Sequence, residues 1–337
     1  MNNKFKNYFF IILAGVLLPT IALTQNTLTF TNAAATGDQG PTQAQVTAAY
    51  DGTTLEDDVT ITTQGIQEWT VPADGIYTIE ARGAAGISTS GAAGYGARMK
   101  GDFTLTQGTV LKILVGQMPA TGGYNHAGGG GTFVTKSPYN TTASVLVIAG
   151  GGGGTTASST NVSESHGRIE TSGGASETGA PGGTDGNGAP ASGYSGNKSC
   201  AGQGAGFLTD AGATDCGNIS GDNVAQSFID GGRGGQGSCS RTPRGGFGGG
   251  GGTGCYGAGG GGGYSGGGGS YANGYGGGGG SYNGGSAQSN TAGENDGQGQ
   301  VVITYCTGMC FESIAKAADN SYVDVTFTAG VYNTNGG

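Results

Sequence analysis

The chain has 337 residues, a formal net charge of −9 and only 10% charged residues, while 79 of its residues are glycine. Such an acidic, weakly charged chain lacks the basic face that attracts nucleic acids and anionic membranes, so we expect no nucleic-acid partner. With only 8 prolines and no regular third-position glycine, the composition also excludes collagen.

The first 24 residues have the features of a secretory signal peptide. Lys4 and Lys6 precede an apolar stretch at 8–23, and an Ala-Leu-Thr sequence precedes Gln25. An uncleaved membrane anchor is the alternative for this stretch, and no other segment is apolar enough to span a bilayer. We therefore expect an exported protein, located outside the cell or on its surface, with no further membrane span.

Residues 25–64 are expected to form an N-terminal strand and helix segment. Leu28 lies in an alternating apolar pattern, and a short helix is predicted to begin after Pro41, because proline suits the first helical turn. A further strand is predicted at 59–63.

Alternating apolar residues then predict two hairpins. Strands at 67–71 and 76–81 flank a Pro-Ala-Asp-Gly turn, and strands ending at Leu105 and covering 110–115 flank a Gln-Gly turn. Each pair is expected to be neighbours in one sheet, because short turns usually join adjacent antiparallel strands.

The remaining strand signals surround the glycine-rich region. A short strand is predicted at 132–135, and the continuous apolar run at 145–148 is typical of a strand covered on both faces. After the glycine runs, 301–305 is expected to close the framework. We predict one all-β domain over 65–306, with irregular surface loops over 155–200.

The tail changes in character after this domain. Alternation over 322–327 predicts a strand, followed by a turn, with no partner strands in view. We expect 311–337 to be the truncated start of a second all-β, Ig-like domain, and the chain to be a fragment of a longer protein.

All six cysteines follow the expected signal peptide, and an even number in an exported chain suggests disulfides. Nearest-neighbour pairing is favoured, since a closed loop of about 15 residues contributes about 3 kcal/mol, although the sequence cannot choose among the connectivities. A metal site is the rival interpretation, but no Cys-x-x-Cys pair occurs. The favoured pairs are Cys200 with Cys216, Cys239 with Cys255, and Cys306 with Cys310.

The glycines gather in short uninterrupted runs. Pure glycine can adopt the polyglycine II helix, a threefold extended helix that packs side by side through its N–H and C=O groups. Ordering glycine costs much backbone entropy, so a floppy insertion is equally open from the residues alone. The main runs are 150–154, 248–252, 259–263, 266–269 and 276–280.

Six aromatic residues are candidates for ligand contact or for packing. Large amphipathic rings dominate many protein interfaces, and most of these stand beside the glycine runs. The candidates are Trp69, Tyr256, Tyr264, Tyr271, Tyr275 and Tyr282.

No catalytic constellation is visible, so we expect a non-enzymatic protein. The chain has only two histidines, and its acids are scattered without an adjacent nucleophile. Oxygen ligands at 185–188 and 295–297 could hold Ca²⁺, although turns use the same residues far more often. We expect no other cofactor.

A Gly-Gly-Phe-Gly run at 245–252, Cys255, a Gly-Tyr run at 259–264 and an Asp-Gly strand at 296–303 follow one another in order. This pattern, over roughly 65–305, resembles the extracellular glycine-rich domain of the anaplastic lymphoma kinase and leukocyte tyrosine kinase receptors. The resemblance implies a β-sandwich of tumour-necrosis-factor-like form, with an insertion of packed polyglycine II helices, that binds a protein ligand.

The chain departs from these receptors in ways that bear on function. It contains no Val-Ala-Ile-Lys strand, no His-Arg-Asp and no Asp-Phe-Gly, so the resemblance brings no kinase activity. Its signal peptide and tail resemble those of large exported proteins of the Bacteroidetes. We favour a binding or adhesion module for a protein or surface ligand; the alternatives are the ectodomain of a kinase-like receptor and a structural surface spacer.

Overall fold

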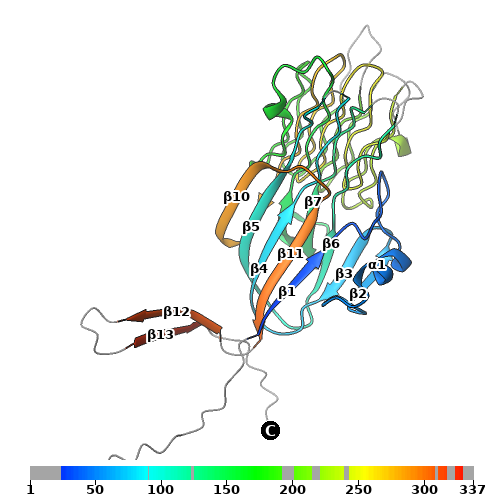
Figure 1. Ribbon diagram of the computed structural model, residues 1–337. Helices are drawn as coiled ribbons and strands as arrows, with labels where there is room; N and C mark the ends of the chain where they lie inside the picture. The colour runs from blue at the N-terminus through cyan, green and yellow to red at the C-terminus, as the bar shows by residue number, and fades with distance from the viewer. Residues whose placement is uncertain are drawn as a thin grey trace, which may run out of the picture.

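Two antiparallel sheets form the framework of the molecule (Figure 1). The computed structural model describes residues 24–89, 91–122, 125–191, 201–214, 221–238, 243–307, 310–316 and 323–328. The expected signal peptide lies almost wholly outside these residues. The chain is nearly all β, as the strand pattern predicts, and within the described residues it contains the single α-helix α1, Gln43–Tyr50.

The first sheet has five strands in the order β1-β11-β4-β5-β10. Its strands are β1 (Thr24–Phe30), β11 (Gln300–Thr307), β4 (Gly75–Arg82), β5 (Gly96–Leu105) and β10 (Ser286–Asn295). The closing strand β11 lies between β1 and β4, with Val301 opposite Phe30 on one side and Ala81 on the other. The strand predicted at 301–305 is therefore an interior strand that joins β1 to the rest of the sheet.

The second sheet has six strands in the order β2-β3-β6-β7-β8-β9. Its strands are β2 (Val59–Thr63), β3 (Ile66–Thr70), β6 (Val110–Leu114), β7 (Thr132–Lys136), β8 (Val145–Ala149) and β9 (Tyr282–Asn283). Because β1 and β2 are edge strands of the two sheets, the expected N-terminal segment is an integral part of the sandwich.

Both predicted hairpins are wrong in their pairing. β3 and β4 lie in different sheets, as do β5 and β6; β3 pairs with β6, and β4 pairs with β5. The connections at 71–74 and 106–109 run side by side, because the N–H of Val71 donates to Thr109 and that of Gly108 donates to Val71, each at 2.9 Å. A two-stranded ribbon thus bends from one sheet to the other, so alternation located the strands but not their partners.

Helix α1 begins close to its predicted start. Thr42 is the N-cap, and its side chain and that of Gln45 form a reciprocal capping box. Pro41 precedes the cap instead of lying in the first turn. Val46 and Tyr50 are the buried residues of the helix, and the Tyr50 hydroxyl donates to Gln67 at 2.6 Å, which ties the helix to β3.

The main core fills the space between the two sheets. Tyr77, Ile79 and Ala81 alternate inward along β4 and are fully buried, as the period-two pattern predicts. Trp69 of β3 lies edge-on to Tyr77, with ring centroids 6.3 Å apart. Tyr305 of β11 stacks on Tyr77 at 4.9 Å, so the core contains a continuous aromatic cluster.

A second core covers the outer face of the six-stranded sheet. Phe228 of the glycine-rich insertion stacks on Phe133 of β7 and on Phe207, at 5.3 and 5.4 Å. Ile148 of β8 belongs to this cluster, whereas its neighbour Val147 belongs to the main core. This burial on both faces explains the continuous apolar run of β8, as predicted.

Three strands lie outside the predicted set. β10 pairs with β5 through irregular register, and β9 has two residues; both lie in polar, glycine-rich sequence without an apolar pattern. β12 (Cys310–Lys316) pairs with β13 (Val323–Thr328) in a separate two-stranded sheet. The tail strand therefore has a partner, contrary to the prediction. The rest of the expected tail domain lies outside the described residues.

The connections contain short 3₁₀ turns and irregular segments, some of which are buried and hydrogen-bonded. The turns are η1 (Thr142–Ser144), η2 (Val162–Ser165) and η3 (Gly221–Asn223). Parts of the expected surface loop at 155–200 are instead buried: Gly174 and Gly183 are inside the molecule and hydrogen-bonded to glycines of distant runs.

Candidate functional site

The glycine runs form an ordered layer beyond one end of the sheets, seen mainly in green and yellow in Figure 1. Within the run 259–263, residues three apart donate hydrogen bonds to the same neighbouring segment, 126–129. The N–H groups of Gly259 and Gly262 donate to His126 and Gly129 at 2.7 and 3.0 Å. A three-residue repeat of lateral bonds differs from the two-residue repeat of a sheet.

This run exchanges backbone hydrogen bonds with segments from the whole glycine-rich region. Its partners lie at 126–129, 151–154, 202–205, Gly251, Gly267 and Gly277. A Cβ added at Gly261 would stand 2.2 Å from the carbonyl oxygen of Gly151, so the packing leaves no room for a side chain. We call this set of segments the glycine layer.

Three turns lie together at the end of the glycine layer that is farthest from the sheets. The turn at 254–257 leads to Ala258, whose carbonyl accepts from Ser270 at 2.9 Å. Ser270 begins the turn at 270–275, and the turn at 155–160 follows Gly154, whose carbonyl accepts from Gly276 at 2.9 Å. We call these three turns the turn end.

The turn end carries three of the six aromatic candidates. Tyr256 is 60% exposed and Tyr271 and Tyr275 are half-buried. The backbone bonds of Ser270 with Ala258 and of Gly276 with Gly154 are within two residues of these tyrosines, so all three belong to the turn end.

Glu177 holds two of the three turns together. Its carboxylate accepts the N–H of Tyr275 at 3.1 Å and the N–H and hydroxyl of Thr160. Charge-assisted hydrogen bonds of this kind are stronger than neutral ones. No sequence pattern points to Glu177, because its partners are distant along the chain.

The turn end is acidic around Tyr275. Burial raises the pKa of the Tyr275 hydroxyl, and the negative charges of Glu164 and Glu177 raise it further. The phenol is therefore neutral at physiological pH, a hydrogen-bond donor beside two carboxylates.

The other three aromatic candidates are packing residues. Trp69 and Tyr264 are 3% and 6% exposed, in the main core and the second core respectively. Tyr282 of β9 stacks on Tyr264 at 5.2 Å. The sequence leaves contact and packing open for each of the three. Burial assigns Trp69 and Tyr264 to packing, and half-buried Tyr282 packs against Tyr264.

Two cysteines of the framework have defined states. Cys255, at the turn end, is buried and disulfide-bonded, while Cys306 is a free thiol. The predicted bond between Cys306 and Cys310 is therefore wrong. Cys306 lies in β11 opposite Gln25 of β1, whereas Cys310 begins β12 and pairs with β13, so the two follow different strand partners.

The remaining cysteine predictions lie outside the described residues. The partner of Cys255 is not among those residues, so its predicted pairing with Cys239 stays a prediction. The same holds for the predicted bond between Cys200 and Cys216.

The two calcium candidates form turns. The amide of Asn295 donates to the carbonyls of Gly83, Gly297 and Gln298 at 2.7, 3.2 and 2.8 Å, so its N–H₂ group faces the chain. At the other candidate, the amide of Asn187 donates to Thr184 at 3.0 Å. Such Asx-type bonds stabilise turns.

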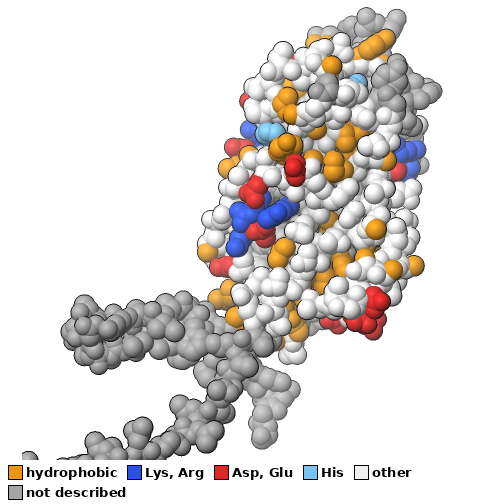
Figure 2. Space-filling view, in the orientation of Figure 1, with side chains coloured by type: hydrophobic (Ala, Val, Ile, Leu, Met, Phe, Trp, Pro, Cys, Tyr) orange, Lys and Arg blue, Asp and Glu red, His pale blue; other side chains and the backbone are white. Residues whose placement is uncertain are grey.

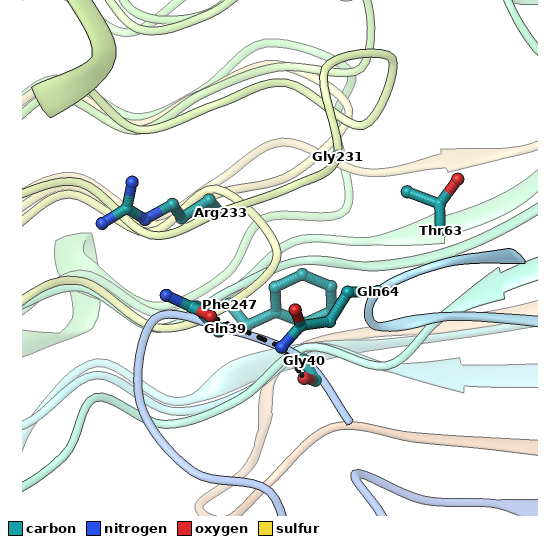
Figure 3. A pocket seen from close by; sticks show the side chains of 7 residues that line it. All are labelled: Gln39, Gly40, Thr63, Gln64, Gly231, Arg233 and Phe247. Atoms are coloured by element: carbon teal, nitrogen blue, oxygen red, sulfur yellow. Dashed lines mark hydrogen bonds between the residues drawn. The ribbon is translucent and has the colours of Figure 1, made fainter. Parts of the chain in front are cut away.

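A hollow of about 290 Å³ lies where the N-terminal segment meets the glycine layer (Figure 3). The Phe247 ring forms its floor and fits against Gly40 and Gly65, where an added Cβ would come within 2.4 and 2.2 Å of the ring. Gln64 donates to Gln39 and to the carbonyl of Gly40 at 3.4 and 3.3 Å. Two of its polar side chains thus bond to each other, and Arg233 pairs with Asp38 at 3.2 Å, so we assign this hollow a packing role.

The outer face of the five-stranded sheet carries a mixed group of charges, visible over β4, β5 and β10 (Figure 2). Glu80 joins Arg82 and Arg98 at 2.8 and 2.7 Å, and Arg98 also lies 3.6 Å from Glu294. Burial opposes ionisation of Glu80, but hydrogen bonds from both arginines outweigh it and lower its pKa. The two arginines and the two glutamates of this group balance in charge, so this face does not select a charged ligand.

Across the described residues, no group of three or more histidines, cysteines or acids could hold a metal ion. No helix in the same part of the chain is long and apolar enough to cross a membrane. No family model matches the chain.

Proposed function

We propose that the chain is an extracellular, non-enzymatic binding or adhesion module that recognises a protein or surface ligand with its turn end. The observation that carries this proposal is the grouping of Tyr256, Tyr271 and Tyr275 on two of the three turns of the turn end, which adjoin a buried backbone layer. Tyrosine rings supply large contact areas at low cost in side-chain entropy, and a rigid support lowers the cost of binding.

We also infer that the glycine segments are polyglycine II helices, in a sandwich of tumour-necrosis-factor-like form. The three-residue repeat of lateral bonds supports the helix assignment, since the polyglycine II helix has three residues per turn. Export through the expected signal peptide at 1–24 belongs to the same proposal.

A binding screen tests the function directly. The purified chain would be screened against arrayed extracellular proteins and glycans, together with the Tyr256→Ser/Tyr271→Ser/Tyr275→Ser variant. We expect specific ligands of the wild type to lose at least tenfold in affinity in the variant. The matched control is Ile76→Ser/Ile229→Ser, which removes two exposed apolar side chains elsewhere. No specific ligand, or equal loss in both variants, would contradict the proposal.

A further inference from the structure

The edge strand β10 departs from its partner at one place, where three of its residues, 292–294, oppose the single residue Ala97 of β5. We call these three residues the β10 bulge. Outside the strand ladder, one described backbone bond holds the bulge, because the N–H of Gly293 donates to the carbonyl of Gly167 at 3.2 Å. Side-chain contacts therefore decide how firmly the bulge is held.

The ring of His166 lies directly against the β10 bulge. A Cβ added at Gly293 would stand 2.5 Å from the Cγ of His166, so the ring and the bulge are in close contact. The ring stacks on Tyr95 at 5.2 Å, and its Nδ1 accepts the N–H of Tyr95 at 2.9 Å. A neutral imidazole that accepts at Nδ1 carries its proton on Nε2, so this arrangement requires the neutral ring.

The chain on either side of His166 is firmly bonded. The carbonyl of Ser165 accepts the N–H of Gly153 at 2.7 Å, and the N–H of Arg168 donates to Gly279 at 2.9 Å. The β10 bulge, with its single lateral bond, belongs to an exposed edge strand. If the ring loses its position, we therefore expect the bulge to move and the segment that carries His166 to stay in place.

Few charges surround the ring, and the neighbouring glycine run contributes none. The charged and titratable residues on the elements packed around it are Tyr95, Arg98, Glu164, Arg168, Glu170 and Glu294. Arg98 lies 3.6 Å from Glu294, and Arg168 lies 3.4 Å from Glu170. Burial lowers the pKa of His166, so the folded chain favours the neutral form that the geometry requires.

We propose that His166 is an acid-sensitive latch, which holds the β10 bulge against the segment 165–168 when neutral and releases it when protonated. A proton added to Nδ1 would point at the N–H of Tyr95, and two donors cannot bond to each other. The imidazolium also needs water, which it reaches only if the bulge lifts away from the ring. The latch acts on the edge of the five-stranded sheet and does not depend on the proposed binding function.

Amide hydrogen exchange of residues 291–295 in the full chain tests this latch. Each rate is divided by the intrinsic rate at the same pH, so that the ratio reports the opening of the structure. Because the proton binds the released form more tightly, opening should increase about three- to tenfold between about pH 7.5 and about pH 5.5. The amides of the interior strand β4 should keep their protection at both pH values.

Two variants separate the latch from a general loss of stability. In His166→Asn, an oxygen takes the place of Nδ1 and does not titrate, so the bulge should stay closed at both pH values. Gly293→Ala places a methyl group against the ring and should open the bulge at both pH values. Gly52→Ala is the control, because Gly52 has a similar left-handed backbone, at φ +69°, and nothing within 4 Å of the added Cβ.

Three results would overturn the proposal. The first is an unchanged ratio at 291–295 in the wild type between the two pH values. The second is an increase of the same size in His166→Asn, which would assign the effect to another group. The third is a parallel loss of protection in β4, which would mean that acid unfolds the whole domain instead of releasing its edge.

Discussion

Close contact with neighbouring backbone requires glycine at many positions of the layer. The space around each glycine decides how much stability a substitution by alanine would cost. At Gly261 an added Cβ would lie 2.2 Å from the carbonyl oxygen of Gly151. At Gly297 it would meet nothing within 4 Å, and the backbone there is not left-handed. The two positions therefore form a matched pair.

We expect Gly261→Ala to lower the free energy of unfolding by at least about 1–3 kcal/mol, the usual cost of overpacking. Gly297→Ala should be neutral or stabilise by up to about 1 kcal/mol, because alanine restricts the unfolded chain. Urea unfolding of both variants measures the difference. Equal effects of the two substitutions would mean that the layer does not pack as described.

His166 makes stability depend on pH. Its ring stacks on Tyr95 at 5.2 Å, and its Nδ1 accepts the N–H of Tyr95 at 2.9 Å. Burial lowers the pKa of His166 below 6.5. As the pH falls, the histidine of the unfolded chain therefore binds its proton before that of the folded chain. The stability that neutral His166 contributes is complete above pH 6.5 and is lost as the pH falls below this value.

We expect the ring signals of His166 in an NMR titration to report a pKa below 6.5. In His166→Gln, the fall in unfolding midpoint between about pH 7.5 and about pH 5.5 should be smaller than in the wild type, since this histidine no longer titrates. A pKa at or above 6.5, or an unchanged pH dependence, would contradict this account.

At the scale of elements, α1 closes the open edge of the six-stranded sheet. The amide of Gln43 donates to the carbonyl of Val59 at 3.1 Å and accepts the N–H of Ile61 at 2.7 Å. One side chain thus occupies two of the backbone groups that an added strand would use on β2. Covered edges of this kind protect sheets from unwanted pairing.

Gln43→Ala should remove both bonds and cost about 1–2 kcal/mol of unfolding free energy. It should also increase concentration-dependent association, measured by light scattering, because the β2 edge becomes available. Gln107→Ala is the control, since this exposed side chain makes no hydrogen bond within the described residues. If both variants behave alike, Gln43 does not protect the edge.

The sequence predicts an element when the pattern that identifies it is local, and not when the element depends on contacts between distant residues. β2, β4 and β8 were located from alternation or from a continuous apolar run, because each pattern is local. The strand partners of β3 and β4 are not predictable in this way, because the sequence at the bend between the two sheets resembles that of a hairpin turn. β10 was missed because its exposed residues carry no apolar pattern.

The candidate site was predicted only in part. Tyr256, Tyr271 and Tyr275 were selected from their places between glycine runs, whereas the burial of Trp69 and Tyr264 depends on contacts between distant segments. Glu177 gave no sequence signal at all, because its partners lie in other turns.

At the scale of the whole molecule, the glycine layer joins the framework to the proposed binding surface. Its segments are held mainly by backbone hydrogen bonds between glycines, so their packing positions the turn end. The account depends on this order more than on any single side chain.

Hydrogen exchange followed by mass spectrometry over 245–285 tests this order most directly. We predict strong protection of the amides in 259–263 and 276–280, comparable to that of β4 and β8, because these residues are buried and their N–H groups, except that of Gly278, donate hydrogen bonds to other segments. The exposed residues 140–143, whose N–H groups donate no hydrogen bond within the described residues, provide the fast-exchanging reference in the same chain. Exchange of the glycine runs at the rate of these residues would contradict the account.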